Sequence, residues 1–393
     1  MKKVLIIAKE FYPNNTGFAH AAVNLVKSIK MYDKKDDYQL HIFTDTKLGQ
    51  EKELQNVNVI RFDSKFSSNE GNPLLLMRNI MKYKFLKRFI EKENIDVIFF
   101  ETNIHHLLVN LIQNKFNDKV VVRLHSTIDT EVLMDFPKSL PGKVFRKMTL
   151  NFMKKAENIV STNPYHLDFT KNRMFNSNEY ITWENKGYFL LPNTLIQEKE
   201  HKSSKREDYI LTLGKLSRQG YIQKGLPDLL KAVYLLHEYN QIPKSFKLKL
   251  IGQGEMESEI KNLIKKLNIG EYIDLIPSTT HQETLSLIKE AKAVVLVSRY
   301  EGQSMFLTEA LALGKTLITT KETGVSHMVK EGYNGFLVNK GDYKDIAEKL
   351  IDLYKLSDQT IEQYEENSFE LFNNEFSPKE VYRNFELLVK FMK

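Results

Sequence analysis

The sequence predicts an α/β protein with two doubly wound domains that face each other across a cleft. Short apolar runs alternate with longer segments of amphipathic helical spacing along the whole chain, which is the pattern of buried parallel strands joined by helices. A polar segment interrupts this alternation, and the pattern then starts again. With 393 residues, 42% of them hydrophobic, the chain is long enough for two domains.

The first half of the chain contains the strands and helices of one such domain. Its apolar runs predict strands at 4–8, 39–43, 57–61, 96–100, 120–124, 158–161 and 188–191. Helical spacing predicts helices near 18–31, 74–92, 104–115, 140–155 and 164–173. The segment 198–208 is polar and charged and has no periodicity, so it is the predicted linker.

The second half repeats the architecture without repeating the sequence. Strands are expected at 209–213, 247–251, 272–276, 293–297, 316–319 and 335–338. The helices expected between and after them are 225–238, 255–267, 281–290, 304–313, 342–355 and 358–373. A last helix at 377–392 begins at Ser377-Pro378, a typical helix start. The predicted domains are therefore 1–197, together with the closing helix 377–393, and 205–376.

Positive charge gathers in the first half of the chain. Residues 1–195 hold 29 Lys and Arg against 21 Asp and Glu, a net charge of +8, and the rest of the chain stands at −1. Two segments, 78–92 and 138–155, interleave cations with apolar residues at helical spacing. Each fits a solvated helix face, an anionic membrane surface or a soluble polyanion. Nucleic acid is disfavoured because the segments offer few aromatic side chains for stacking on bases.

Composition excludes several classes of protein. The chain has no cysteine, which rules out disulfides and thiolate metal sites. Its apolar runs are far shorter than the roughly 18 residues that a membrane span needs. The apolar part of the opening MKKVLIIAKEF is also too short for a signal peptide, so the stretch fits a first buried strand.

Glycine turns follow several predicted strands. In Pro13-Asn-Asn-Thr16-Gly17, glycine lies between a strand and a helix, where backbone N–H groups meet the positive end of the helix dipole. This turn is either an ordinary connection or a loop for a phosphate or an acceptor. The turn containing Gly252 is generic by itself.

A cationic segment follows the first strand of the second half. Residues 213–225 bring together Lys215, Arg218 and Lys224 with glycines and no acidic residue. Fixed cations stabilise a diphosphate leaving group as its charge grows in the transition state. The alternative is an exposed lysine-rich loop.

Two glutamates stand eight positions apart in SRYEGQSMFLTEALALGKT, at 301 and 309. A helical rise of ~1.5 Å per residue separates such positions by about 12 Å, too far for the paired carboxylates of a glycosidase. The spacing suits an elongated polar ligand, with Glu309 on a ribose diol and Glu301 on hydroxyls at the other end. The Gly302-Gln303-Ser304 turn offers amides at the start of the next helix.

Polar residues at the ends of first-half strands complete the set of candidates. His125 follows one strand, and Glu101 and Asn103 follow another, which places them on the acceptor side at the same sheet edge. The pair His105-His106 lacks a matching carboxylate cluster, and the chain has no Asp-x-Asp. We therefore expect no metal site.

Taken together, these stretches resemble the retaining glycosyltransferases of family 4, whose two-domain architecture is called GT-B. The resemblance covers nearly the whole chain and is strongest over 301–314, which is similar to the family's glutamate–seven residues–glutamate motif. It is supported by Gly214-Lys215, Lys224-Gly225, Gly252-Gln-Gly254, Leu191-Pro-Asn193, Thr323-Gly-Val and Gly332-Tyr-Asn-Gly335-Phe-Leu-Val.

The resemblance implies a role for each candidate residue. Glu309 would hold the ribose, and Glu301 would hold the sugar. Lys224 would neutralise the diphosphate, and His125 would border the reacting carbon. The remaining donor-side residues would be Gly17, Lys215, Arg218, Gly252, Gln303, Ser304, Met305 and Phe306, with Thr16, Asn103 and His125 toward the acceptor. The last helix would cross back to the first domain.

This chain departs from the family pattern at three places. Lys215 stands where the family has arginine, and the gap from there to Lys224 is longer than usual. The family's paired glycines near the first strand are reduced to Thr16-Gly17, and Gln303 stands where an aromatic or small residue is common. The sugar preference therefore does not transfer, and either Lys215 or Arg218 would take over the role of the arginine.

The sequence thus predicts a cytoplasmic, retaining and metal-independent glycosyltransferase, peripheral to the inner face of the membrane. It would need no cofactor and would use a nucleotide sugar, UDP-linked by family frequency, as co-substrate. The acceptor would be an envelope glycan, a lipid-linked sugar or a teichoic-like anionic polymer. The alternatives are a nucleotide-sugar epimerase or hydrolase on the same fold, and a catalytically silent protein that binds a glycan or a partner.

Overall fold

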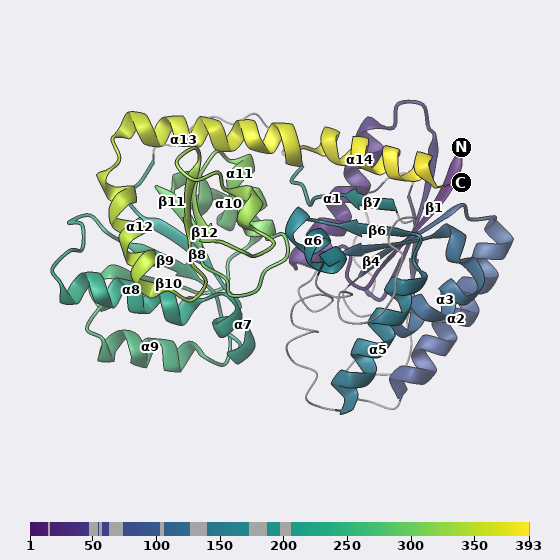
Figure 1. The fold of residues 1–393 in the computed structure, drawn as a ribbon, viewed down its shortest axis with the longest axis horizontal. Coiled ribbons are helices and arrows are strands. Elements are labelled where there is room, and N and C mark those ends of the chain that lie inside the picture. Colours follow the sequence, from purple (N-terminus) through teal and green to yellow (C-terminus); the bar gives the residue numbers. More distant parts are fainter. Residues whose placement is uncertain are drawn as a thin grey trace. The chain divides into compact units, whose positions relative to one another are not determined.

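The structure is a computed structural model that describes residues 1–14, 16–46, 54, 57–62, 74–102, 106–125, 140–172, 187–196 and 206–392. The chain divides into two compact units (Figure 1). Unit 1 comprises Met1–Ile196 and Pro378–Lys393, and unit 2 comprises Gln197–Ser377. The strands and helices that the sequence predicts are present, each within two residues of its predicted bounds.

Unit 1 contains a parallel sheet of seven strands in the order β3-β2-β1-β4-β5-β6-β7. The strands are β1 (Lys2–Ala8), β2 (Tyr38–Thr44), β3 (Asn58–Arg61), β4 (Val97–Thr102), β5 (Val120–Leu124), β6 (Asn158–Ser161) and β7 (Gly187–Leu190). The first strand lies between the second and the fourth, so the strand order reverses at β1 and β4. Loops after these two strands therefore meet at the carboxyl edge where ligands usually bind.

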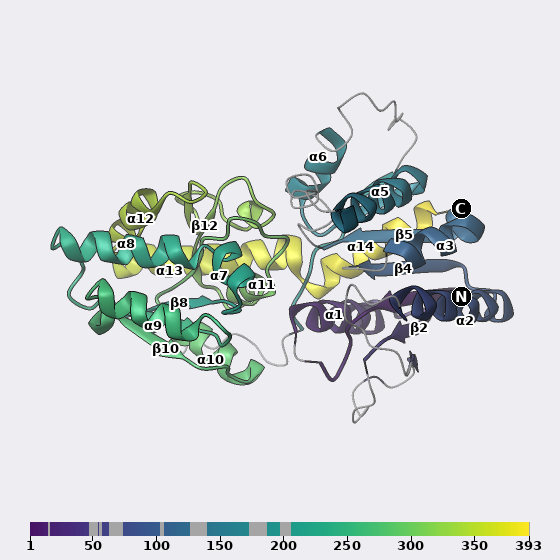
Figure 2. The same cartoon turned by 90° about the horizontal axis from the view of Figure 1, so that it is seen from below.

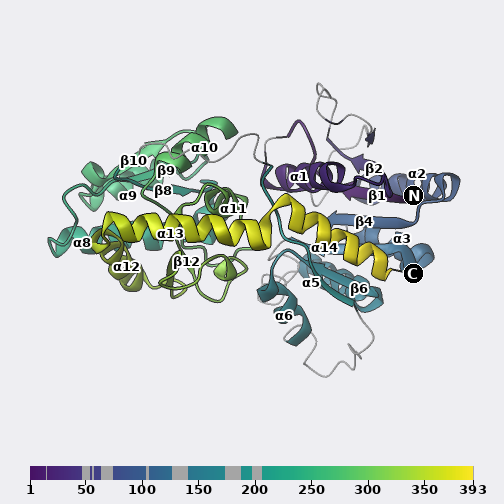
Figure 3. The same cartoon turned by 90° about the horizontal axis from the view of Figure 1, so that it is seen from above.

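Helices cover both faces of this sheet because its side chains alternate between two apolar clusters. Leu5 and Ile7 face the cluster that α2 (Leu74–Glu93), α3 (His106–Phe116) and α5 (Leu140–Lys155) complete. Val4 and Ile6 face the cluster formed with α1 (Gly17–Tyr32) and α14 (Pro378–Phe391). Figure 3 shows α14 beside α1 over this second face. The last helix thus packs on the first unit, as the fold prediction required. The remaining helix, α6 (Pro164–Asn172), follows β6.

Unit 2 contains a parallel sheet of six strands in the order β10-β9-β8-β11-β12-β13. The strands are β8 (Ile210–Leu213), β9 (Leu248–Ile251), β10 (Ile273–Ile276), β11 (Ala293–Leu296), β12 (Thr316–Thr320) and β13 (Gly335–Val338). The helices are α7 (Arg218–Gln223), α8 (Leu226–Glu238), α9 (Glu257–Lys266), α10 (His281–Glu290), α11 (Met305–Ala312), α12 (Tyr343–Lys355) and α13 (Asp358–Leu371). Side chains of α8, α9 and α12 form one apolar cluster with the sheet. Figure 2 shows α8 and α9 next to each other.

Two elements differ from the sequence prediction. The helix α7 lies inside the segment expected to be a loop, because Ser217 caps it by accepting from the Gly220 amide at 3.1 Å. A glycine in the middle of a six-residue segment argues against a helix, so the propensity signal was weak. A π-helix, Phe372–Phe376, follows α13 before Ser377 ends it and α14 begins.

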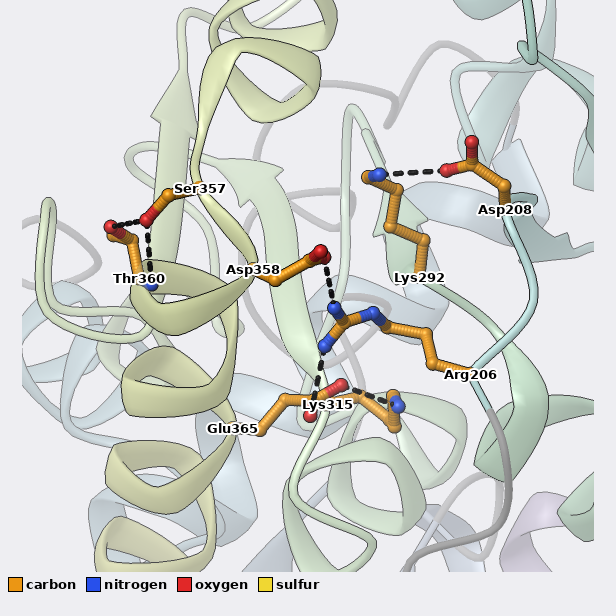
Figure 4. Close-up of polar contacts among 8 residues, drawn as sticks. All are labelled: Arg206, Asp208, Lys292, Lys315, Ser357, Asp358, Thr360 and Glu365. Atoms are coloured by element: carbon orange, nitrogen blue, oxygen red, sulfur yellow. Dashed lines mark hydrogen bonds and ion pairs between the residues drawn. The ribbon is translucent and has the colours of Figure 1, made fainter.

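Unit 2 is tied together near its start by a charged cluster (Figure 4). The Arg206 guanidinium contacts Asp358 at 2.5 Å and Glu365 at 3.5 Å, both on α13. Glu365 also pairs with the buried ammonium of Lys315 at 2.7 Å. The carboxylate of Glu365 thus joins α13 to the strand that follows Lys315.

Candidate functional site

The loops after β8 and β11 carry the predicted donor residues, and they leave adjacent strands at the point where the strand order of unit 2 reverses. When the connections after two adjacent parallel strands run to opposite sides of the sheet, a crevice forms at the carboxyl ends of those strands. The helices that follow begin there with exposed amides. The sheet topology therefore brings residues 214–224 and 298–304 to one edge.

Lys224 and Glu301 form an ion pair at this edge. The Lys224 ammonium donates to Glu301 Oε2, which also accepts from the Ser298 hydroxyl at 3.2 Å. Glu301 is largely buried, and its carbonyl accepts from the Gly324 amide at 2.9 Å. The Lys224 ammonium and the Glu301 carboxylate are thus in contact although the two residues are 77 positions apart in the chain.

The close approach of Lys224 depends on Gly225. This glycine has φ +66°, and a Cβ built on it would lie 2.0 Å from the Val297 carbonyl oxygen. Only glycine fits so near another backbone segment in the left-handed region. The Arg299 amide then donates to the Gln223 carbonyl at 2.8 Å, which fixes the two loops together.

An ion pair with two hydrogen bonds also holds these two loops together. Arg299 donates from Nε and Nη2 to the two oxygens of Asp228, each at 2.9 Å. Asp228 is buried on α8, so its carboxylate needs this partner. The pair connects the residue two positions before Glu301 to the helix that begins just after Lys224.

The start of α11 lies between the two glutamates. Ser304 caps the helix by accepting from the Leu307 amide at 3.5 Å, and Gln303 donates to the Thr308 hydroxyl at 3.2 Å. The first amides of a helix have no acceptor within it, and Met305 and Phe306 are the first two residues of α11. Gln303 supports the loop in this arrangement.

Glu309 lies further along α11 and is 5% exposed. Its Oε1 accepts from Nε2 of His281, the first residue of α10, at 3.0 Å. The bond to Glu309 raises the pKa of His281 against the opposing effect of burial. Sequence reasoning missed His281, which there marked only the start of a helix.

The other predicted donor residues of unit 2 lie after β8 and β9. Lys215 and Arg218 are exposed, and within the part of the chain that the structure describes neither side chain has an ion-pair partner. Gly252 packs against the first loop, since a Cβ there would lie 2.2 Å from the Gly214 carbonyl oxygen. The loops after β8 and β9 are therefore in direct contact.

Unit 1 holds a buried polar network at the carboxyl ends of β4 and β5. Arg123 is fully buried and donates to Glu101 at 2.8 Å, to Asn193 at 3.0 Å and to the Leu191 carbonyl at 2.9 Å. The other oxygen of Glu101 is bonded to Nε2 of His125. One carboxylate therefore joins the guanidinium to the imidazole.

Charge in this network is set by burial and by Arg123. Burial alone would raise the pKa of Glu101, but the Arg123 guanidinium and His125 outweigh it and lower the pKa to about 2. Burial also lowers the pKa of His125. Near neutral pH the carboxylate is therefore ionised and the imidazole is neutral, with Nε2–H directed at Glu101 and Nδ1 left as an acceptor.

The glycine turn after β1 also has defined contacts. The Thr16 side chain caps α1 by accepting from the Ala19 amide at 3.2 Å, and its hydroxyl donates to Glu10. Gly17 opens the helix and is exposed. Asn103 lies outside the described residues, so its acceptor-side role stays a prediction.

The described residues offer neither a cluster of metal ligands nor a membrane-spanning helix. In that part of the chain, no group of three or more His, Asp and Glu side chains is placed to hold a metal ion. Over the same residues, no helix has both the length and the apolar character that crossing a bilayer requires.

Comparison with known proteins relates the chain to sugar-transferring enzymes. Residues 194–370 match the family model described as glycosyl transferases group 1. An uncharacterized glycosyltransferase of Methanocaldococcus jannaschii is 27% identical over 344 residues, which are 87% of this chain and 86% of that protein. The capsular polysaccharide biosynthesis glycosyltransferase CapM of Staphylococcus aureus is 27% identical over 219 residues, 54% of this chain and 53% of that protein.

Solved structures establish the fold. Sucrose-phosphate synthase from Thermosynechococcus elongatus superposes with a TM-score of 0.77 at 14% identity, covering 100% of this chain and 99% of that one. HepE of Anabaena in complex with UDP and glucose gives a TM-score of 0.68 at 15% identity, covering 99% of this chain and 100% of that one. The chain therefore has the GT-B fold, and the fold-class prediction is confirmed.

Proposed function

The comparisons support a group 1 glycosyltransferase, and we propose a reaction for it. In this proposal the protein moves a sugar from a UDP-sugar to a hydroxyl of an envelope glycan, with retention at the anomeric carbon. The observation that carries the proposal is the arrangement around α11. Two buried carboxylates, Glu301 and Glu309, lie before and within this helix, whose first amides lack acceptors inside it. Lys224 reaches the first of them.

Each part of the donor would meet a suitable group. Glu309 would accept from the ribose hydroxyls, and Glu301 would accept from hydroxyls of the sugar. Lys224 and either Lys215 or Arg218 would bind the diphosphate, together with the amides at the start of α11. A uridine nucleotide is proposed because HepE, which shares the fold, was solved with UDP and glucose.

The proposed reaction needs no covalent intermediate with the protein. The bond from the anomeric carbon to the phosphate oxygen breaks, and the acceptor oxygen bonds to the same face of that carbon. The departing phosphate oxygen takes the acceptor's proton. Cations at the diphosphate contribute most after the bond has lengthened, when charge on the leaving group is largest. We propose that these fixed cations act without a metal ion, so a chelator should leave activity unchanged.

Unit 1 is proposed to bind the acceptor. Its polar network presents the neutral imidazole of His125, held by Glu101, at the carboxyl edge of the sheet. The capsular polysaccharide function named for CapM supports a role in envelope polysaccharide biosynthesis. The basic surplus of the first half of the chain fits an anionic acceptor or the surface that carries it.

We also propose that unit 1 binds an anionic membrane from the cytoplasmic side. Along α2, the apolar side chains of Met77, Met81 and Phe85 are exposed, as are the basic side chains of Lys84 and Arg88. Arg78 and Lys82 of the same helix are buried and pair with Asp45. Apolar side chains that can enter the headgroup region, flanked by cations, are typical of helices that bind at a bilayer surface.

A donor screen tests the proposed function. Purified protein is incubated with UDP-, GDP-, ADP- and TDP-sugars, with and without envelope glycan fractions, and nucleotide release is measured. We expect acceptor-dependent release from a UDP-sugar that falls at least a hundredfold in Glu309→Gln and in Lys224→Gln. The matched controls are Glu259→Gln and Lys266→Gln, which change exposed residues of α9.

Other outcomes separate the alternatives. Release of nucleotide and free sugar at the same rate without acceptor would indicate a hydrolase, and conversion of the donor sugar would indicate an epimerase. No turnover of any donor, with glycan binding intact in Glu309→Gln, would indicate a catalytically silent binding protein.

A further inference from the structure

The His281–Glu309 pair was not predicted from the sequence, and its geometry is asymmetric. His281 Nε2 contacts only one carboxylate oxygen of Glu309, Oε1, at 3.0 Å. Within the described part of the chain, Oε2 has no hydrogen-bond partner, and it is not among the buried polar atoms sealed from solvent. One oxygen is thus held by the protein, and the other is available to a ligand.

The pair also fixes a side chain that would otherwise be adjustable. A glutamate has three rotatable side-chain bonds, and holding it in one geometry costs conformational entropy unless a partner restrains it in advance. Because His281 is the first residue of α10, capped by Thr280, its backbone is anchored by the helix start. Packing of α10 against α11 then sets the distance between the ring and the carboxylate.

We propose that His281 is a positioning residue for the donor's ribose. It holds Oε1 of Glu309 so that Oε2 faces the vicinal hydroxyls of a nucleoside diphosphate. This inference rests on the proposed function, in which Glu309 binds the ribose, and adds the residue that orients it. Both the neutral and the protonated imidazole can donate from Nε2, so the contact does not require a particular charge state.

A binding experiment with paired nucleotides tests the role. UDP, ADP and GDP are titrated into the wild-type protein by calorimetry, and the tightest of them is compared with its 2′,3′-dideoxy analogue. We expect His281→Ala to weaken binding of the ribonucleotide about tenfold, in keeping with loss of a charge-assisted contact. The dideoxy analogue has no diol for Glu309 to bind, so its affinity should be equal in the two proteins.

Two further variants exclude a loss of folding. His281→Gln keeps an N–H donor and should recover part of the affinity, whereas His237→Ala, a histidine on α8 of the same unit, should bind both nucleotides normally. In turnover assays His281→Ala should raise KM for the donor and leave kcat nearly unchanged, because it changes ground-state and transition-state binding equally.

The outcomes distinguish this inference from the proposed function. If Glu309→Gln weakens ribonucleotide binding but His281→Ala does not, the positioning role is wrong and the ribose site stands. If Glu309→Gln has no effect, the ribose site itself is wrong. If His281→Ala weakens the ribonucleotide and the dideoxy analogue equally, the histidine acts elsewhere on the nucleotide. Failure of all three nucleotides to bind would overturn both proposals.

Discussion

Charged residues in this protein are held by specific partners at the carboxyl edges of the two sheets. In unit 2, Glu301 meets Lys224 and Glu309 meets His281. In unit 1, Arg123 donates to Glu101, whose other carboxylate oxygen is bonded to His125.

Removing Arg123 should be costly for unit 1. Without the guanidinium, Glu101 becomes a buried carboxylate with only a neutral histidine as partner, a change that typically costs about 3–5 kcal/mol. We expect Arg123→Met to lower the free energy of unfolding by about this amount in urea. Arg123→Lys should not restore it, since a single ammonium cannot reach three acceptors in different directions.

An exposed ion pair provides the control for this prediction. Lys115 and Glu91 pair at the surface, each 43% exposed, and solvent screens such pairs so that they contribute little to stability. Lys115→Met should therefore leave the unfolding free energy nearly unchanged. A cost for Arg123→Met no larger than that of Lys115→Met would mean that the buried network adds little to stability.

The ring of His281 should titrate above its ordinary pKa of 6.5. Its bond to Glu309 raises the pKa in the folded state, so the stabilisation is complete below about pH 6.5 and is lost as pH rises through the folded pKa. NMR titration should show the raised pKa in the wild type and a lower one in Glu309→Gln. Equal pKa values in the two proteins would mean that the pair does not form in solution.

The sequence revealed those residues whose spacing along the chain carries chemical meaning. Glu301 and Glu309 stand out because both surround one helix start, and Lys224 because it lies among cations and glycines. His281 is 28 positions from its partner, and Arg123 lies inside an apolar strand. Neither position has a local pattern, since the contact exists only after the strands and helices have packed.

Among the elements, the loops that begin α8 and α11 depend on a close approach of two backbones. The sequence predicted both helices because their apolar periodicity is strong, but it missed α7, whose glycine and small size conceal it. That short helix ends at Gln223, and Lys224 is its C-cap, directly before Gly225. The position of Lys224 therefore follows from backbone geometry as well as from side-chain packing.

Gly225→Ala should disrupt this junction. The left-handed backbone costs an alanine about 1–2 kcal/mol, and the clash with the Val297 carbonyl adds about 1–3 kcal/mol more. We expect reduced thermal stability and loss of nucleotide release. Gly332→Ala is the matched control, because Gly332 has φ +72° and no atom within 4 Å of the added methyl group. Equal losses of stability in both variants would show that backbone strain, and not the close approach, dominates.

The exposed apolar side chains of α2 should bind membranes. Met77→Gln with Met81→Gln removes apolar surface without changing the charge, so sedimentation with phosphatidylglycerol vesicles should fall severalfold while the unfolding midpoint stays constant. The control is Leu387→Gln, which changes an exposed apolar side chain of α14. If the double variant sediments with vesicles as well as the wild type does, the binding comes from charge and not from insertion of the two methionine side chains.

For the molecule as a whole, the fold was the most predictable property. Parallel strands buried on both faces are nearly continuous apolar runs, so Val4–Ile7 or Val294–Leu296 stand out without any structural information. The order of strands within each sheet has no such local sign, because it depends on which connections cross over. The pairing of the strands in the structure gives this order.

Each unit has apolar clusters of its own, and we expect two transitions on unfolding in urea. Arg123→Met should move one of them. Glu365→Ala should move the other, since it leaves the buried Lys315 ammonium without its carboxylate (Figure 4). The double variant should show both shifts added together. A single transition moved by both substitutions would mean that the units unfold as one.

The packing of α14 on unit 1 has a consequence for the order of events during synthesis. Phe385 and Val389 fill the cluster that includes Leu25 and Ile29 of α1, yet the ribosome makes them only after every residue of unit 2. Unit 1 therefore begins first in the chain but cannot complete its apolar cluster until α14 has been made. Chains that lack residues 378–393 should therefore have a first domain with an uncovered apolar face, which would recruit chaperones until α14 is made and packs against it.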